Sequence, residues 1–161
     1  MRMLRWLAIL LAAACGAAPS APDGQEPLSV VRLRPEPVSF TYASGMTEPQ
    51  QLVVRDRGAW QQAWDAIWRT HVPRPPLPDA DFTRDMIVIA ALGTRSTGGY
   101  SIFIESASEG PEGVAVRVRV VSPGSACAVT LATTQPVDVA RVPRRDGAVV
   151  FSQRNEVQDC R

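Results

Sequence analysis

A cluster of prolines between residues 73 and 78 limits how this chain can fold. The cluster comprises Pro73, Pro75, Pro76 and Pro78. No helix continues through such a run, because proline lacks the amide hydrogen and clashes with the preceding helical turn. The clearest helical pattern lies just upstream, where Asp56 is a suitable N-cap for an apolar stripe at helical spacing. The stripe consists of Trp60, Trp64, Ile67 and Trp68. The sequence therefore predicts one Trp-rich helix that ends before the prolines.

The segments around this helix have the patterns of β-strands. Met86–Leu92 is continuously apolar, as in a strand buried on both faces, and valines alternate with other residues from Val114 to Val120. Pro123-Gly124 ends that second strand. Further strands are expected at Ser29–Leu33, Val38–Tyr42, Gln51–Arg55, Tyr100–Glu105, Gln135–Val142 and Ala148–Ser152, with a turn at Ser108–Gly113. We expect an α+β domain in which an antiparallel meander, curled or not toward a barrel or sandwich, is packed by the Trp-rich helix.

The N-terminal segment has the features of a bacterial export signal. Arg2 and Arg5 precede a short apolar run that ends in Leu11-Ala12-Ala13-Ala14-Cys15-Gly16, which resembles a lipobox. Cys15 would then carry the lipid, with palmitate among its acyl chains; the alternative is ordinary signal cleavage near Ala14 or Ala18. The expected organisation is a signal peptide at 1–15, a Pro/Ala-rich tether at 16–28 and one domain at 29–161. The expected location is the cell envelope, at the outer membrane or the outer face of the inner membrane.

Two cysteines remain once Cys15 is lipidated or removed. Cys127 and Cys160 would then meet in an oxidising compartment, where a disulfide between them is expected. Such a bond would attach the C-terminal tail to the body of the domain. The alternative is a pair of free thiols, since neither cysteine has the spacing of a metal or redox motif.

The charge and the polar residues argue against several classes of function. The formal net charge of +1 falls to about −1 without Arg2 and Arg5, which does not favour nucleic-acid binding. The sole histidine, His71, lies beside the proline cluster without a partner motif, so we expect no catalytic residues, no metal and no cofactor. Asp79, Asp81 and Asp85 form an acidic cluster that could bind Ca²⁺, although turn-forming acids are the favoured interpretation.

The loop between the two central strands is the most informative candidate site. It follows the buried strand at Gly93 and contains Gly98-Gly99, a pair that permits backbone angles closed to other residues. A polar loop held between rigid strands is a good recognition surface. The candidate partner-binding residues are Arg95, Ser96, Thr97, Gly98, Gly99 and Tyr100. The loops at Ser122–Cys127 and Thr134–Pro136 would extend this surface.

Several short motifs in the second half of the chain resemble the PrcB C-terminal domain family. They are Asp81-Phe82, Met86-Ile87-Val88, Leu92-Gly93, Thr97–Ile102, Ser122-Pro123-Gly124, Cys127-Ala128-Val129 and Thr134-Gln135-Pro136. Their order resembles the family over roughly residues 50–152, and the Trp60/Trp64 helix also fits. The family is named after a lipoprotein subunit of a surface protease complex. The resemblance implies an accessory role in protein binding and supplies no catalytic residues.

A second, shorter resemblance concerns the same loop. Ser96–Tyr100 is similar to the loop by which chagasin-type inhibitors enter cysteine-protease clefts, although the Asn-Pro of that loop is missing. We therefore expect a non-catalytic envelope lipoprotein that binds an exported protein, such as a protease, through Arg95–Tyr100. The alternative is a domain that binds a small molecule or glycan through Trp60, Trp64 or Trp68; exposed indoles would favour it and buried ones would oppose it.

Overall fold

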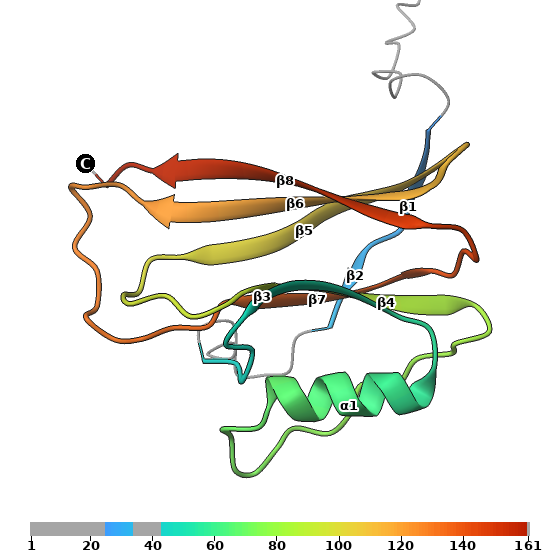
Figure 1. Ribbon diagram of the computed structural model, residues 1–161, viewed down its shortest axis with the longest axis horizontal. Helices are drawn as coiled ribbons and strands as arrows, with labels where there is room; N and C mark the ends of the chain where they lie inside the picture. The colour runs from blue at the N-terminus through green and yellow to red at the C-terminus, as the bar shows by residue number, and fades with distance from the viewer. Residues whose placement is uncertain (1–24, 34–42, 161) are drawn as a thin grey trace, which may run out of the picture.

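The computed structural model describes residues 25–33 and 43–160. These residues form one helix and eight strands (Figure 1). The elements are β1 (Glu26–Leu28), β2 (Val31–Arg32), β3 (Pro49–Val54), α1 (Arg57–Ile67), β4 (Asp85–Leu92), β5 (Ser101–Gly110), β6 (Gly113–Pro123), β7 (Val137–Pro143) and β8 (Val149–Gln158). The signal peptide, Cys15 and the strand expected at Val38–Tyr42 lie outside the described residues. No helix in the described part is long and apolar enough to cross a membrane.

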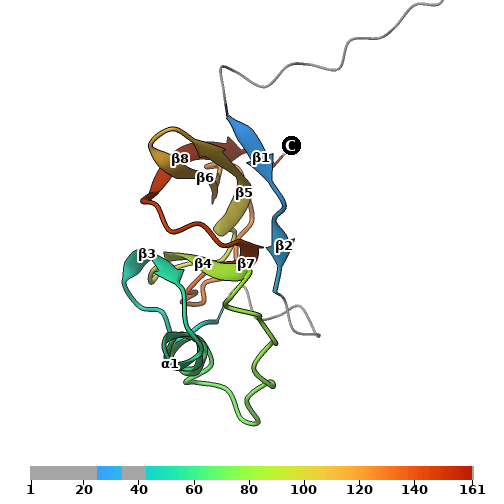
Figure 2. The same ribbon diagram turned by 90° about the vertical axis from the view of Figure 1, so that its right-hand side faces the viewer.

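The strands form two stacked four-stranded sheets that do not close into a barrel (Figure 1). The first sheet has the order β1-β5-β6-β8 and the second the order β2-β7-β4-β3. Figure 2 shows β1 and β2 along one side of the sandwich, with β8 and β3 on the opposite side. The predicted α+β class with one Trp-rich helix is therefore confirmed, in its sandwich form. One pair departs from the antiparallel pattern, since β6 and β8 run parallel.

Strand β4 is buried on both faces, as its continuous apolar sequence predicted. Met86, Val88 and Ala90 face the first sheet and pack against the alternating valines of β6. Ile87, Ile89 and Ala91 point the other way, toward the helix. The domain therefore has two apolar layers, one between the sheets and one between the second sheet and α1.

Helix α1 begins and ends where the sequence predicted. The Asp56 side chain caps its first turn by accepting a 2.8 Å hydrogen bond from the Ala59 amide. Trp60, Trp64 and Trp68 are all buried against the second sheet. The proline segment that follows the helix crosses back beside it, and the carbonyls of Pro78 and Pro75 accept hydrogen bonds from the Trp60 and Trp64 indoles at 2.9 and 3.1 Å.

A buried carboxylate joins the two sheets on the β1/β2 side. Asp138 on β7 is fully buried, and one of its oxygens accepts a 2.8 Å hydrogen bond from the Ile104 amide on β5. Arg32 on β2 donates to the same oxygen at 3.2 Å and to the Ile104 carbonyl at 2.9 Å. Strand β5 has a register shift between Ile104 and Ser106, so the Asp138 contact lies at a β-bulge.

Several boundaries differ from the sequence prediction. Strand β5, expected at Tyr100–Glu105, runs from Ser101 to Gly110, so the turn expected at Ser108–Gly113 is shorter. Glu26–Leu28, expected within the tether, form β1 and pair with β5, so the ordered domain starts earlier than residue 29. Strand β8 was expected to end at Ser152 and instead continues to Gln158. Both segments lie at a sheet edge with exposed side chains, so neither shows the alternation of apolar residues that marks a half-buried strand.

The disulfide between Cys127 and Cys160 is present, as predicted. It connects the segment after β6 to the end of β8, over a sequence separation of 33 residues. A hydrogen bond from the Gly124 amide to the Gln158 carbonyl, at 2.9 Å, lies beside it. The last strand is thus attached to its neighbour by both covalent and backbone bonds.

Candidate protein-binding surface

The loop Arg95–Tyr100 leaves the end of β4 at a tightly packed glycine. Gly93 has φ of +72°, and a Cβ atom there would lie 2.7 Å from the Pro49 ring, so glycine is required. The next residue is fixed to the segment before β3, because the Thr94 amide and hydroxyl both donate to the Thr47 carbonyl, at 2.9 and 3.1 Å. The start of the loop is therefore held rigidly by β3 and β4.

Residues 130–134, which precede β7, support the other side of the loop. Arg95 and Thr134 exchange backbone hydrogen bonds of 2.8 and 2.9 Å, and the Thr134 hydroxyl donates to the Thr97 carbonyl at 2.9 Å. Thr134 itself is buried. The Gly98 amide donates to the Thr130 carbonyl at 2.9 Å. The loop and residues 130–134 are thus joined by an isolated β-bridge and two further hydrogen bonds.

The two glycines of the loop have packing roles. Gly98 is buried, and a Cβ atom there would lie 2.3 Å from the Thr130 hydroxyl. Gly99 has φ of +86°, and a Cβ there would press on Pro123 and Val129 at 3.0 Å. Of the six predicted partner-binding residues, these two position the loop. The other four predicted residues carry the side chains of the loop, and among them Ser96 is exposed.

Arg95 connects the loop to a groove between the sheets. Its guanidinium carbon lies 5.7 Å from the centre of the Tyr100 ring, within the range of a cation–π contact. Its Nε is buried and has no hydrogen-bond acceptor among the described residues. A buried donor without an acceptor is costly, so the hydrogen bonding of Arg95 is incomplete among the described residues.

The groove runs between the free edges of the two sheets and has a volume of about 430 Å³. Its lining comes from strands β3, β4, β5 and β8 together with Arg95. The lining residues are Pro49, Gln50, Gln51, Ala91, Leu92, Arg95, Ile102 and Gln153. The lining therefore combines side-chain amides and one guanidinium with apolar residues.

The structure adds Leu131, a residue that the sequence did not single out. Its side chain is 93% exposed, and it directly follows Thr130, whose carbonyl binds Gly98. Leu131 thus adds one exposed apolar side chain to this polar surface. Its only sequence signal is a leucine within the polar run Thr130–Thr134, which does not distinguish a surface position from a core one. We define the Arg95 surface as residues 95–100 with 130–134.

The neighbouring loops take different positions relative to this surface. Thr134 is part of it, through its bonds to Arg95 and Thr97. Pro136 is buried and its carbonyl accepts from the Leu92 amide at 2.9 Å, so it supports the start of the loop. From Ser122–Cys127, Pro123 lies close to Gly99, while Cys127 is bound to Cys160 at the end of β8.

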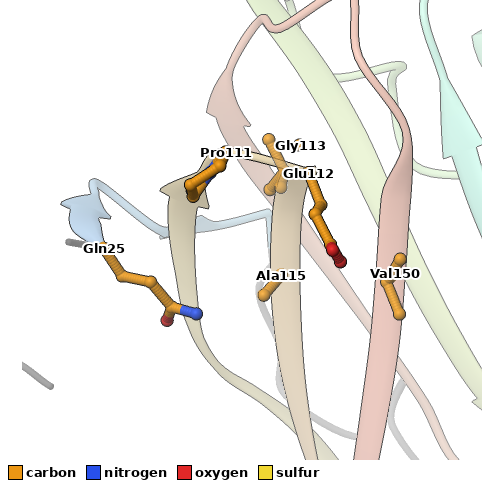
Figure 3. A pocket seen from close by; sticks show the side chains of 8 residues that line it. Gln25, Pro111, Glu112, Gly113, Ala115 and Val150 are labelled. Carbon is orange, nitrogen blue, oxygen red and sulfur yellow. The ribbon is translucent and has the colours of Figure 1, made fainter. Parts of the chain in front are cut away.

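The three tryptophans offer no site for a glycan or other small ligand. Trp60 and Trp64 are each 1% exposed and Trp68 is 5% exposed, so their indole rings pack against core side chains. A different hollow, of about 370 Å³, lies at the β5–β6 turn (Figure 3). Its lining includes Gln25, Pro111, Glu112 and Val150, with glycine backbone between them. It has few side chains that converge on a ligand, so the Arg95 surface is the stronger candidate.

The other residues considered from the sequence have local partners. His71 contacts the Trp68 ring edge-on at 4.8 Å between ring centres. Asp81 accepts from the Thr83 amide and hydroxyl, at 3.0 and 2.6 Å, which lowers the pKa of its carboxyl. Asp79 and Asp85 face Arg57 and Arg141 respectively. No group of three or more potential metal ligands occurs within 25–33 and 43–160.

An ionic cluster covers the outer face of the first sheet. Glu105 on β5 accepts from Arg154 on β8 at 2.7 and 2.9 Å and from Arg119 on β6 at 2.9 Å. The hydrogen bonds from Arg154 are the main reason that the pKa of Glu105 is lowered, with Arg119 adding to the effect against partial desolvation. The same contact raises the pKa of Arg154. The cluster therefore ties β8 to the sheet.

The chain forms a small β-sandwich with a polar loop that is braced by backbone and side-chain hydrogen bonds. Residues 86–143 match the model of the PrcB C-terminal family, which confirms the resemblance noted in the sequence over this segment. The match spans β4 to β7 and contains the whole Arg95 surface; the helix, β3 and β8 lie outside it. No curated protein and no solved structure matches the chain.

Proposed function

We propose that this protein is a non-catalytic accessory subunit that binds an exported protease through the Arg95 surface. The observation that carries the proposal is the placement of that surface within the segment that matches the PrcB C-terminal family. The family name points to a protease-complex subunit. The rigid bracing of the loop supports binding without large rearrangement, which favours affinity.

The proposal includes the envelope location and the lipid anchor at Cys15, which the lipobox-like sequence supports. A tether before the domain would leave the Arg95 surface free to reach a partner at the membrane. The partner's contribution would be an acceptor group for Arg95 and an apolar contact for Leu131. Arg95 and Tyr100 fix its orientation, because both are held by the loop.

The test is co-purification of the full chain from the envelope of the source bacterium, with peptidase activity and mass spectrometry as readouts. We expect a protease to co-purify with the wild type. The amount of co-purified protease should fall at least about tenfold with Arg95→Ala/Tyr100→Ala, because hot-spot residues dominate interfaces. Leu131→Ser is a second variant that changes only the surface. Val72→Ser is the matched control, since Val72 is 97% exposed and lies after the helix, outside the Arg95 surface.

Capture of a protease that is unaffected by the double variant and by Leu131→Ser would place the contact elsewhere and refute the proposed site. Absence of any protease from the wild-type sample would refute the proposed partner. The alternative of a small-molecule or glycan-binding domain would then rest on the hollow beside Val150 (Figure 3), and thermal-shift screening with Val150→Arg as the blocking variant would test it.

A further inference from the structure

The outer edge of β8 is a long strand edge with no partner in the described part of the chain. β8 has ten residues, Val149–Gln158, and pairs with β6 on one side only. From Ser152 to Gln158 every residue is exposed. Such an edge is a template for another strand, and proteins usually shorten or cover it.

The direction of the backbone groups along this edge is set by the pairing with β6. The carbonyls of Gln158 and Glu156 point toward β6, where they accept from the Gly124 amide at 2.9 Å and the Ser122 hydroxyl at 3.3 Å. Backbone groups alternate in direction along a strand. The amides and carbonyls of Gln153, Asn155 and Val157 therefore point outward, along the free edge.

We propose that two copies of this chain pair through antiparallel β8 strands, with the two-fold axis at Asn155. In this register Asn155 faces Asn155 of the second copy, and their outward amides and carbonyls form a reciprocal pair of hydrogen bonds. Gln153 lies opposite Val157 of the second copy, which brings the 63% exposed Val157 against another side chain. The first sheet of one copy then continues into the first sheet of the other, so that the two form one continuous sheet.

Charge complementarity selects this register. With the axis at Asn155, Arg154 lies opposite Glu156 of the second copy, and the reverse pair forms by symmetry. If the axis lay at Arg154 instead, Arg154 would lie opposite Arg154 of the second copy, which is an unfavourable like-charge pair. Arg154 and Glu156 already lie 3.3 Å apart within one copy and are 51% and 45% exposed, so both can be shared with the second copy.

The test is sedimentation velocity of the full chain in mild detergent over a range of concentrations. We expect a wild-type dimer, and a dissociation constant raised about tenfold or more for Arg154→Glu and for Glu156→Arg, since each creates two like-charge pairs across the axis. An equimolar mixture of these two variants should dimerise again, because one copy then presents two carboxylates and the other two guanidinium groups. Arg117→Glu, exposed on the interior strand β6, is the charge-matched control.

A backbone variant tests the same register without charge. Asn155→Pro removes an outward amide that β6 does not use, so it should abolish the dimer while the near-ultraviolet circular dichroism of the buried tryptophans is retained. The proposal is overturned if the wild type stays monomeric up to concentrations on the order of 100 µM, a weak limit for a specific interface. It is equally overturned if a dimer forms that none of the β8 variants weakens, or if the mixture fails to restore pairing.

Discussion

At the scale of single residues, Glu105 is the side chain with the most consequential electrostatics. It receives hydrogen bonds from arginines of two other strands, and its pKa is lowered chiefly by Arg154. A carboxyl whose pKa falls on folding stabilises the protein fully above its unfolded value and loses that effect as the pH drops through its folded value. The cluster is therefore a stabilising feature at neutral pH that acid removes.

We predict that Glu105→Gln lowers the free energy of unfolding at pH 7, and that its difference from wild type shrinks as the pH falls below 4.5, the ordinary value for this carboxyl. Urea denaturation of both proteins at a series of pH values measures the difference in their free energies of unfolding. The titration of other groups, such as Asp81, largely cancels because both proteins contain them. Glu112→Gln, at the exposed β5–β6 turn, is the control and should show little change. A Glu105→Gln difference that does not vary with pH would contradict the ionic explanation.

At the scale of elements, β8 is secured mainly by contacts at its two ends. Its side chains contribute little to the core beyond Val149 and Phe151, which pack at its start. Its far end is secured by the Cys127–Cys160 disulfide and by the Gly124–Gln158 hydrogen bond. The strand is therefore anchored at both ends and supported by polar contacts between them.

Replacing both Cys127 and Cys160 by serine should lower the free energy of unfolding by roughly 3–4 kcal/mol, because the unfolded chain regains the freedom that the loop closure removed. Chemical denaturation of the variant and of the oxidised wild type measures this loss. Hydrogen exchange should show a fall in protection in β4 that matches the loss of global stability, and a further loss through local opening at the end of β8. A loss spread evenly over the domain would contradict the anchoring role.

The elements that the sequence predicted well are those with one buried face or a clear cap. Asp56, the stripe of α1 and the alternating valines of β6 each carry a local pattern that burial enforces. β1 and the second half of β8 lie at exposed edges and show no such pattern. The support of the candidate loop could not be predicted, because the contacts of Gly98 with Thr130 join residues far apart in the chain, which spacing cannot reveal.

At the scale of the whole molecule, the two sheets are joined by Asp138 on the β1/β2 side and by apolar contacts between them. We predict that Asp138→Ala destabilises the domain by about 1–3 kcal/mol, since the buried Ile104 amide loses its acceptor. Asp138→Asn keeps an acceptor oxygen and should cost less. Chemical denaturation of the two variants measures both; equal losses would show that the charge, rather than the hydrogen bond to Ile104, is what matters.

The parallel pairing of β6 with β8 has a consequence for how the domain folds. After β6 the chain crosses to the second sheet and forms β7 there. It then crosses back to the first sheet, where β8 pairs parallel to β6. The first sheet is therefore completed only by β8, which follows all its other strands in the sequence, and such long-range pairing slows folding. Until β8 emerges, β6 has an open edge lined with valines, and an incomplete chain is exposed to aggregation or proteolysis. The strand order thus leaves the first sheet without its fourth strand until β8 has been synthesised.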